Sequence, residues 1–245
     1  MSASNIIYGQ PFEFDEAAHA YTWDGQPVPG VTTILNQLAK PALVPWAAGM
    51  AADYFRTAVE AGRTDYDAIH KESKGAHSKR TKSAGASGTN VHEYAEAYFK
   101  SLPAPELLSD EAKRGVEAFH KWYDSHTIKI LASERMVFSK EHYYAGTCDF
   151  VAEIDGVQGV GDIKTSSGIY PEMRLQTAAY QHAIQEEKGM QFPVRWIIRF
   201  DKKTGEFEAK SFTDFDLDFQ GFKAALTIHR TMKAIQAENK NRSAK

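Results

Sequence analysis

The sequence is poor in cysteine, in long apolar runs and in net positive charge. One cysteine among 245 residues excludes an internal disulfide framework, which fits a reducing cytoplasm. No apolar run approaches the ~20 residues of a membrane span. The opening stretch MSASNIIYGQPFEFDE lacks the basic and apolar pattern of a signal peptide, and it is too acidic for a typical transit peptide. We therefore expect a cytoplasmic protein with no membrane contact.

The formal net charge is −3, so the bulk charge does not indicate a nucleic-acid partner. Any surface for nucleic acid must be a local basic patch. A hydrophobic content of 42% and a charged content of 25% are typical of a soluble globular protein. The length and the absence of internal repeats predict one domain with a helical part.

Local patterns divide the chain into five segments. They predict strand-like and helical segments together, an α/β fold with a helical region before residue 128. The predicted segments are an N-terminal hairpin and lead-in (1–40), a helical region (41–127), the sheet core (128–212), a C-terminal helix (213–238) and a disordered tail (239–245).

Turn and capping residues mark several elements in the first half of the chain. Asp24-Gly25 between two short strand-like runs predicts a hairpin. Thr32 or Thr33 can cap the helix that follows, and Ser109 can cap a later one. Helices are predicted at 45–62 (with Trp46 on the apolar face), 65–72, 89–101 and 110–125.

A basic segment, KESKGAHSKRTK (71–82), lies among these helices and is interrupted by Gly75. Two interpretations stay open for it. It is a solvated loop, or its basic side chains contact phosphates, because the segment leads the chain to His92. The basic side chains concerned are Lys74, Lys79, Arg80 and Lys82.

Three carboxylates and a lysine in the strand-like region call for an explanation, because acidic residues and lysine are disfavoured in strands. They are Glu134, Asp149, Asp162 and Lys164. Since side chains alternate between the two faces of a strand, Glu134 is the one charge in the apolar column Ile130, Ala132, Glu134, Met136, Phe138. The same rule places Cys148 with Phe150, and Asp149 with Val151 on the other face.

The next two strands bring carboxylates together. Asp155-Gly156 predicts a tight hairpin, which Asp149 and Asp162 flank. Lys164 shares a face with Asp162. A buried carboxylate cluster repels itself unless a cation neutralises it, so the pattern indicates a divalent metal.

A plainer interpretation accounts for these charges one at a time. An Asp-x-Lys triplet is expected by chance roughly once in a chain of this length. Edge strands also carry inward charges that block aggregation. The joint arrangement of the charges therefore carries more information than any one of them.

In this arrangement Glu134, the run GTCD (146–149) and the run DIK (162–164) resemble the catalytic core of PD-(D/E)xK nucleases. Two flanking motifs resemble those of the RecB-like exonuclease branch of that superfamily. GTNVH (88–92) is similar to its Gly-x-x-x-His motif, and QTAAY (176–180) is similar to its Gln-x-x-x-Tyr motif. All four motifs follow the order of that family.

The resemblance implies a restriction-endonuclease-like core, which is a central mixed β-sheet flanked by helices on both sides. It also implies hydrolysis of DNA with Mg²⁺ or Mn²⁺. The implied metal ligands are His92, Asp149, Asp162 and the backbone carbonyl of Ile163. The implied catalytic residues are Glu134, Asp149, Asp162 and Lys164, and the implied DNA contacts include Gln176 and Tyr180. Oxygen-rich ligands suit these ions. The single cysteine excludes the four-cysteine iron–sulfur cluster of some RecB-like nucleases.

The resemblance favours a bacterial or phage-encoded exonuclease of DNA recombination, repair or replication. Its expected partners are DNA with a free end and a single-strand annealing or recombination protein. An endonuclease or repair nuclease of the same superfamily, and a non-catalytic DNA-binding module, are the alternatives. For His92, at the edge of an apolar helix face beside Glu96, a structural role is the alternative to ligation. The run HEYAE (92–96) lacks the second histidine of a zinc-protease helix.

Overall fold

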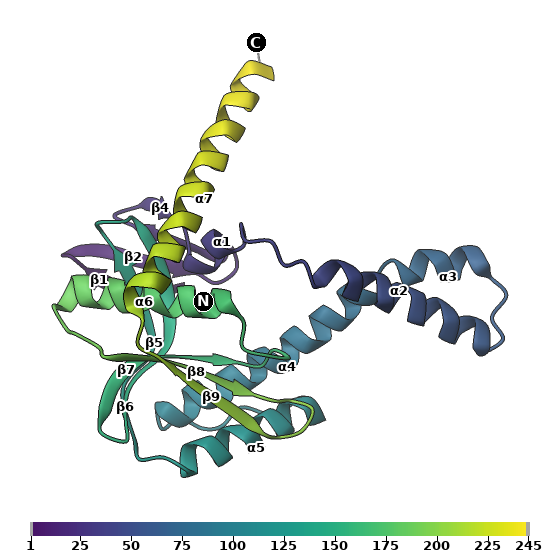
Figure 1. The fold of residues 1–245 in the computed structure, drawn as a ribbon, viewed down its shortest axis with the longest axis horizontal. Helices are drawn as coiled ribbons and strands as arrows, with labels where there is room; N and C mark the ends of the chain where they lie inside the picture. Colours follow the sequence, from purple (N-terminus) through teal and green to yellow (C-terminus); the bar gives the residue numbers. More distant parts are fainter. Residues whose placement is uncertain (1, 244–245) are drawn as a thin grey trace.

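Two β-sheets and seven helices make up residues 2–243, which the computed structural model describes (Figure 1). The first sheet is antiparallel, in the order β1-β2-β3-β4, and its strands are Ser2–Ile7, Gln10–Asp15, Ala20–Trp23 and Gln26–Val28. Asp24 and Gly25 have φ of 50° and 70°, the left-handed backbone of a tight hairpin, so this predicted turn is confirmed. Strands β1 and β2 were not predicted; each has one fully buried apolar side chain, Ile7 in β1 and Phe12 in β2.

The second sheet has five strands in the order β5-β6-β7-β8-β9. Strands β7 and β8 are parallel and the other neighbouring pairs are antiparallel, so the sheet is mixed, as predicted. Helix α6 makes the crossover that a parallel pair needs. The strands are Ile128–Ser139, Tyr144–Ile154, Val157–Lys164, Val194–Phe200 and Phe207–Phe212. The predicted hairpin at Asp155-Gly156 is confirmed by φ of 51° and 83°.

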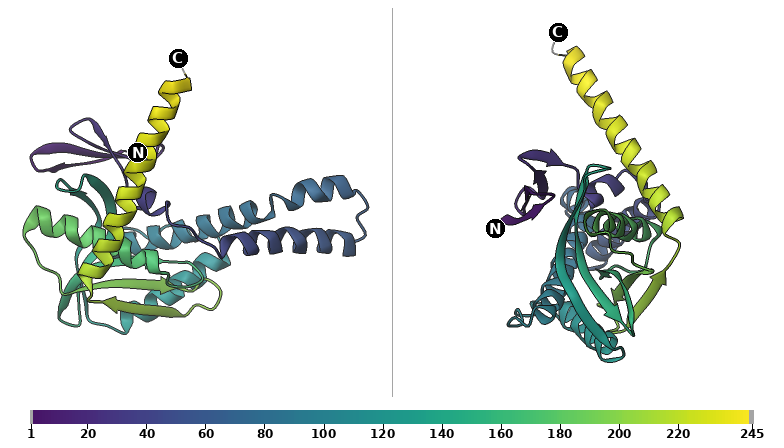
Figure 2. Two further views of the ribbon diagram at one scale, coloured as in Figure 1. Left: turned by 45° about the horizontal axis from the view of Figure 1, so that its top comes forward. Right: turned by 90° about the vertical axis from the view of Figure 1, so that its left-hand side faces the viewer.

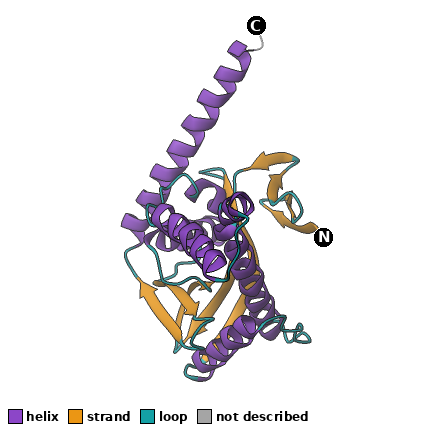
Figure 3. Cartoon of the chain, turned by 90° about the vertical axis from the view of Figure 1, so that its right-hand side faces the viewer, coloured by secondary structure: helices purple, strands orange, loops and turns teal. Residues whose placement is uncertain are grey.

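Helices cover both faces of this sheet, which confirms the predicted α/β class. One face packs against α1 (Val31–Leu35), α6 (Pro171–Lys188) and α7 (Phe215–Ser243). The other packs against α4 (Ala76–Phe99) and α5 (Asp110–Asp124). Figure 3 shows the two helical layers on either side of the strands. Ser109 Oγ accepts the backbone N–H of Ala112 at 3.1 Å, which confirms the predicted cap of α5.

Aromatic side chains join the first sheet to the ends of β5 and β6. The ring of Phe138 stacks on Phe12 and Trp23, at centroid distances of 5.8 and 5.0 Å. The backbone N–H of Ala145 donates to the carbonyl of Pro29 at 3.0 Å. Helix α1 follows directly, and its N-cap is Gly30, so the predicted caps Thr32 and Thr33 are wrong; both lie inside the helix.

Helices α2 (Leu43–Glu60), α3 (Tyr66–Ser73) and the first half of α4 project from the sheet as an arm (Figures 1 and 2). Helix α4 begins at Ala76, well before the predicted start at Thr89. Three of the four basic side chains therefore lie on a helix, so the loop interpretation of this segment is wrong for them. Trp46, predicted on the packed face of α2, is 40% exposed because the arm has little to pack against.

The last helix also exceeds its predicted length. It continues to Ser243, so residues 239–243 are helical rather than disordered; residues 244–245 lie outside the described part. Arg242 and Glu238 form an i,i+4 ion pair at 2.6 Å that supports the final turns. Among the helices of residues 2–243, none is long and apolar enough to cross a membrane.

Candidate active site

Glu134 interrupts strand β5 at the centre of the candidate site. Its φ is +50°, a left-handed conformation that costs a non-glycine residue about 1–3 kcal/mol. On either side Ser133 pairs with Phe150 and Arg135 pairs with Cys148. Backbone strain of this kind in a regular strand is found mostly at functional positions.

The left-handed backbone at Glu134, together with the register shift between Ile130 and Ala132, breaks the predicted alternation of β5. Ile130 packs on the α4–α5 side and Ala132 on the α6–α7 side, so the predicted common column is wrong. On β6, Cys148 packs in the same cluster as Val151, and Phe150 packs on the opposite face, which corrects the predicted grouping. An irregularity of this kind moves the side chains that follow it to the opposite face of the sheet. The sequence gives no local signal for such an irregularity.

Two aspartates lie side by side on β6 and β7, directly beyond the Phe150–Gly161 pair. Asp149 Oδ2 accepts the backbone N–H of Ile163 at 2.6 Å. Asp162 is 1% exposed and forms an ion pair with Lys164, the last residue of β7. No hydrogen bond of good geometry reaches Asp162 Oδ2 within the described part of the chain, so the lysine charge alone compensates it.

Helix α4 brings His92 to these aspartates. His92 Nδ1 lies 3.5 Å from Asp149 Oδ2. The helix can come this close because Gly88, one turn earlier, has no side chain. A Cβ there would lie 2.6 Å from Oγ1 of Thr165, the residue after β7. In the GTNVH motif, Gly88 therefore allows α4 to pack close to Thr165, and this packing places His92 beside Asp149.

The carboxylates raise one another's pKa. Burial, and then the charges of Asp149 and Glu96, raise the pKa of Glu134 to about 8. Burial raises the pKa of Asp149 to about 6, against the opposing effect of Lys164. The pKa of Asp162 is also raised to about 6, by burial and by Asp149. Without a cation, three carboxylates at this site disfavour full ionisation.

The pKa values of the two basic groups of the site shift in different directions. Burial lowers the pKa of Lys164, but Asp162 and Asp149 more than offset this, and the net pKa is raised. Burial and the charge of Lys164 lower the pKa of His92 to about 4. At neutral pH the site therefore holds an ammonium and a neutral imidazole, and the latter is the form that ligates metals.

The donor set suits Mg²⁺ or Mn²⁺ in its chemistry. Asp149 Oδ1 and the carboxylate of Glu134 make no hydrogen bond or ion pair within residues 2–243, so both are available to a cation. Oxygen donors with one imidazole favour these hard ions, Mn²⁺ slightly over Mg²⁺. Across the described residues, however, the ligand atoms of His92, Asp149 and Asp162 do not all lie within 4.8 Å of one another. Lys164 holds Asp162 in this arrangement, so a metal must compete with its ammonium.

The two residues of the QTAAY motif are buried beside the aspartates. Gln176 and Tyr180 are 8% and 3% exposed, and Gln176 Nε2 donates to Tyr180 Oη at 2.8 Å. The ring of Tyr180 fills the space over Gly146, where a Cβ would lie 2.5 Å away. Asp162 and Asp149 contribute to a raised Tyr180 pKa, after burial. Their contact with DNA stays a prediction, while their packing on β6 is observed.

The predicted phosphate contacts lie on the arm. Lys74 is at the C-cap of α3, and Lys79, Arg80 and Lys82 are exposed on α4. Arg80 is paired with Glu111 of α5 at 3.0 Å. The structure places Lys79, Arg80 and Lys82 on the helix that carries His92 and Lys74 just before that helix, and it does not bring the four to the aspartates.

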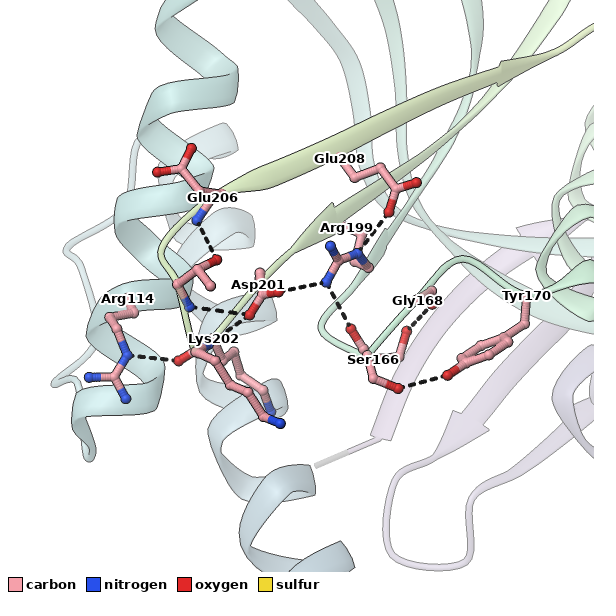
Figure 4. Close-up of polar contacts among 12 residues, drawn as sticks. Arg114, Ser166, Gly168, Tyr170, Arg199, Asp201, Lys202, Glu206 and Glu208 are labelled. Atoms are coloured by element: carbon pink, nitrogen blue, oxygen red, sulfur yellow. Dashed lines mark hydrogen bonds and ion pairs between the residues drawn. The ribbon is translucent and has the colours of Figure 1, made fainter. Parts of the chain in front are cut away.

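Sequence reasoning missed the polar contacts that hold the segment after Lys164 (Figure 4). Arg199 of β8 bonds Glu208 at 3.0 Å and Asp201 at 3.1 Å, and it reaches the carbonyl of Ser166. Lys202, 8% exposed, donates to the carbonyl of Ala84 on α4. These contacts tie α4, and with it His92, to the end of the sheet. Arg199 and Lys202, near the β8–β9 turn, are visible in the sequence as basic residues. Their partners Ser166 and Ala84 lie 33 and 118 positions away, so these contacts could not be predicted.

Comparison with known proteins gives distant likenesses among solved structures. No protein-family model matches the sequence, and no curated protein matches it. Among solved structures, the fold is similar to that of LHK-Exo, which was determined in complex with dAMP. The TM-score is 0.39 at 12% identity, and the match covers 64% of this chain and 84% of that chain.

Proposed function

We propose that the protein is a metal-dependent DNA exonuclease that hydrolyses phosphodiester bonds. The observation that supports this best is the gathering of Glu134, Asp149 and Asp162 with Lys164 at the end of β7. Burying three carboxylates that repel one another lowers the stability of the fold unless a bound cation neutralises their charge. Backbone strain at Glu134 and the contact of His92 with Asp149 support the same site independently.

The proposed ligands are Asp149, Asp162, the carbonyl of Ile163 and His92. When bound, Mg²⁺ or Mn²⁺ lowers the pKa of a water and neutralises charge that develops on the phosphate. Glu134, with its pKa raised to about 8, is mostly protonated near neutral pH without a cation; a bound cation would favour its ionised form, which can hold a further water or accept a proton.

The other residues position the substrate and stabilise charge. Lys164 keeps a full positive charge beside Asp162 and is placed to stabilise the transition state or orient the attacking water. Gln176 and Tyr180 support the strand that carries Asp149 and, in this proposal, align the DNA strand. The basic side chains of the arm, Lys74, Lys79, Arg80 and Lys82, contact phosphates of the incoming DNA. A single-strand annealing or recombination protein is the proposed protein partner.

The test compares linear and covalently closed circular DNA in the presence of Mg²⁺ or Mn²⁺. An exonuclease consumes the linear DNA and leaves the circle intact, whereas an endonuclease of the same superfamily also opens the circle. Asp149→Asn should abolish the loss of DNA. Asp155→Asn, a surface aspartate on the next turn, is the matched control and should keep it. Retarded but intact DNA with every metal would identify a non-catalytic DNA-binding module and contradict the proposal.

A further inference from the structure

A second cluster of side chains that can ligate a metal lies at the β5–β6 turn. The turn follows the last five residues of β5 after Glu134. It consists of Glu141 and His142 on the turn and His182 on α6. Across the described residues, this is the group of three or more His, Cys, Asp or Glu side chains whose ligand atoms all lie within 4.8 Å of one another. Sequence reasoning did not identify it, because 40 residues separate the turn from His182.

The distances within the cluster suit a shared cation better than hydrogen bonds. Glu141 Oε1 lies 3.5 Å from His142 Nε2, and Glu141 Oε2 lies 3.9 Å from His182 Nε2. Both separations exceed the ~3.2 Å limit of an ordinary N–H···O bond. Tetrahedral ligands about 2.0–2.2 Å from a zinc ion are roughly 3.3–3.6 Å apart. Small side-chain adjustments therefore suffice to place one ion among the three groups.

The hydrogen bonds of His182 present the correct ring nitrogen. Tyr144 Oη donates its proton to the carbonyl of Ala179 at 2.8 Å, and a carbonyl can only accept. At 3.3 Å from His182 Nδ1, the tyrosine oxygen can then act only as an acceptor. This contact is slightly longer than an ordinary hydrogen bond, and it favours the His182 tautomer with the proton on Nδ1, which leaves the lone pair of Nε2 facing Glu141. Metal-binding histidines are commonly oriented in this way.

The cluster is also held in place without a metal. Glu186 Oε1 accepts the backbone N–H groups of Lys140 and Glu141, both at 2.9 Å, and its Oε2 accepts Ser139 Oγ at 2.6 Å. The ring of Phe219, from α7, stacks on His182 at a centroid distance of 4.2 Å. The turn and the imidazole are therefore preorganised by groups that are not themselves needed as ligands.

Charges around the cluster set the conditions for binding. Lys223 lies over the Phe219 ring at 5.2 Å, and Arg230 donates to the carbonyl of His142. These cations oppose a divalent ion, while Glu141 and Glu186 attract it. Imidazole nitrogens favour Zn²⁺ and its neighbours over Mg²⁺ or Ca²⁺.

We propose that Glu141, His142 and His182 bind one transition-metal ion of the zinc class, with water at the remaining position. The ion joins the β5–β6 turn to α6 and stabilises the folded state in proportion to its affinity. The site does not depend on the proposed nuclease activity.

The experiment is a Co²⁺ and Zn²⁺ titration of the full chain without an affinity tag. Asp149→Asn is introduced throughout, so that the candidate active site contributes little. We expect one equivalent of metal and an intense visible absorption from tetrahedral Co²⁺, which Zn²⁺ displaces. His142→Ala and His182→Ala should each weaken binding more than about 100-fold, since even outer-shell changes cost 10–100-fold.

Two further variants keep the test decisive. Glu141 is 65% exposed at its side chain, so Glu141→Gln should lose affinity with an unchanged melting temperature in chelator. His126→Ala is the matched control, because His126 also faces a carboxylate, Asp155 at 2.7 Å, but has no second histidine. It should bind normally. Absence of stoichiometric binding, or equal affinity in Glu141→Gln and the parent, would overturn the proposal.

Discussion

Replacing Asp162 by asparagine should change how the stability of the metal-free protein depends on pH. The folded-state pKa of Asp162 is about 6 against an ordinary value of 3.8, a difference of about two pH units. At 1.36 kcal/mol per unit, this corresponds to about 3 kcal/mol in the free energy of unfolding. The raised pKa means that the folded protein holds this proton more tightly than the unfolded chain does. Stability from this group is therefore full below pH 3.8 and is lost as pH rises through 6.

The assay is urea unfolding between pH 4 and pH 8 in the presence of a chelator. Asp162→Asn cannot ionise, so its stability relative to the parent should rise by about 3 kcal/mol between the two pH values. Asp201→Asn is a control with the opposite sign. Burial alone would raise the Asp201 pKa, but the amide of Lys203 and the guanidinium of Arg199 hold it below its usual range. Its stabilising effect is present at high pH and lost as pH falls.

Adding Mn²⁺ completes the test. At pH 8 the ion should restore the stability that the parent protein lost, because it neutralises the carboxylates and binds the folded state alone. It should not stabilise Asp162→Asn to the same extent. If the free energy of unfolding had the same pH dependence in the parent and in Asp162→Asn, the argument that the ionised Asp162 carboxylate destabilises the metal-free fold would be refuted.

Three further changes test other parts of the site. Lys164→Ala should lower turnover by ~10²–10³-fold while Mn²⁺ affinity is kept or rises, because a repelling charge leaves; single-turnover kinetics and calorimetry separate the two effects. His92→Ala should reduce metal affinity and cleavage with little change in the metal-free melting temperature, and a fall in stability with normal affinity would assign the residue a structural role. Gly161→Ala places a Cβ 1.9 Å from the Phe150 ring and should cost about 1–3 kcal/mol in urea unfolding, whereas Gly85→Ala, with open space around it, should not destabilise α4.

Local signals in the sequence were sufficient for several elements. Asp24-Gly25 and Asp155-Gly156 adopt the left-handed turns that their composition favours, and Ser109 caps α5. These turns and this cap depend on residues within a few positions of one another. The mixed sheet with helices on both faces depends on distant strand pairing, and the resemblance to a known family implied it.

Features that depend on distant contacts could not be predicted. Helix α4 runs through Gly85 and Gly88, against their low helix propensity, because Gly88 meets Thr165 and Lys202 holds the carbonyl of Ala84. The left-handed backbone of Glu134 changes which side chains of β5 and β6 point to each face of the sheet. No glycine or asparagine at this position indicates that conformation in the sequence. The Glu141–His142–His182 cluster likewise exists only once the β5–β6 turn meets α6.

A calorimetric Mn²⁺ titration tests the central claim most directly, since the proposed chemistry requires the carboxylates of β6 and β7 to hold a divalent ion. It is best made on the His182→Ala protein, which keeps the turn cluster out of the signal. We predict a saturable binding event that is lost in Asp149→Asn and in Asp162→Asn and kept in Asp155→Asn. Equal Mn²⁺ affinity in all four proteins would contradict the account and remove both aspartates from the metal site.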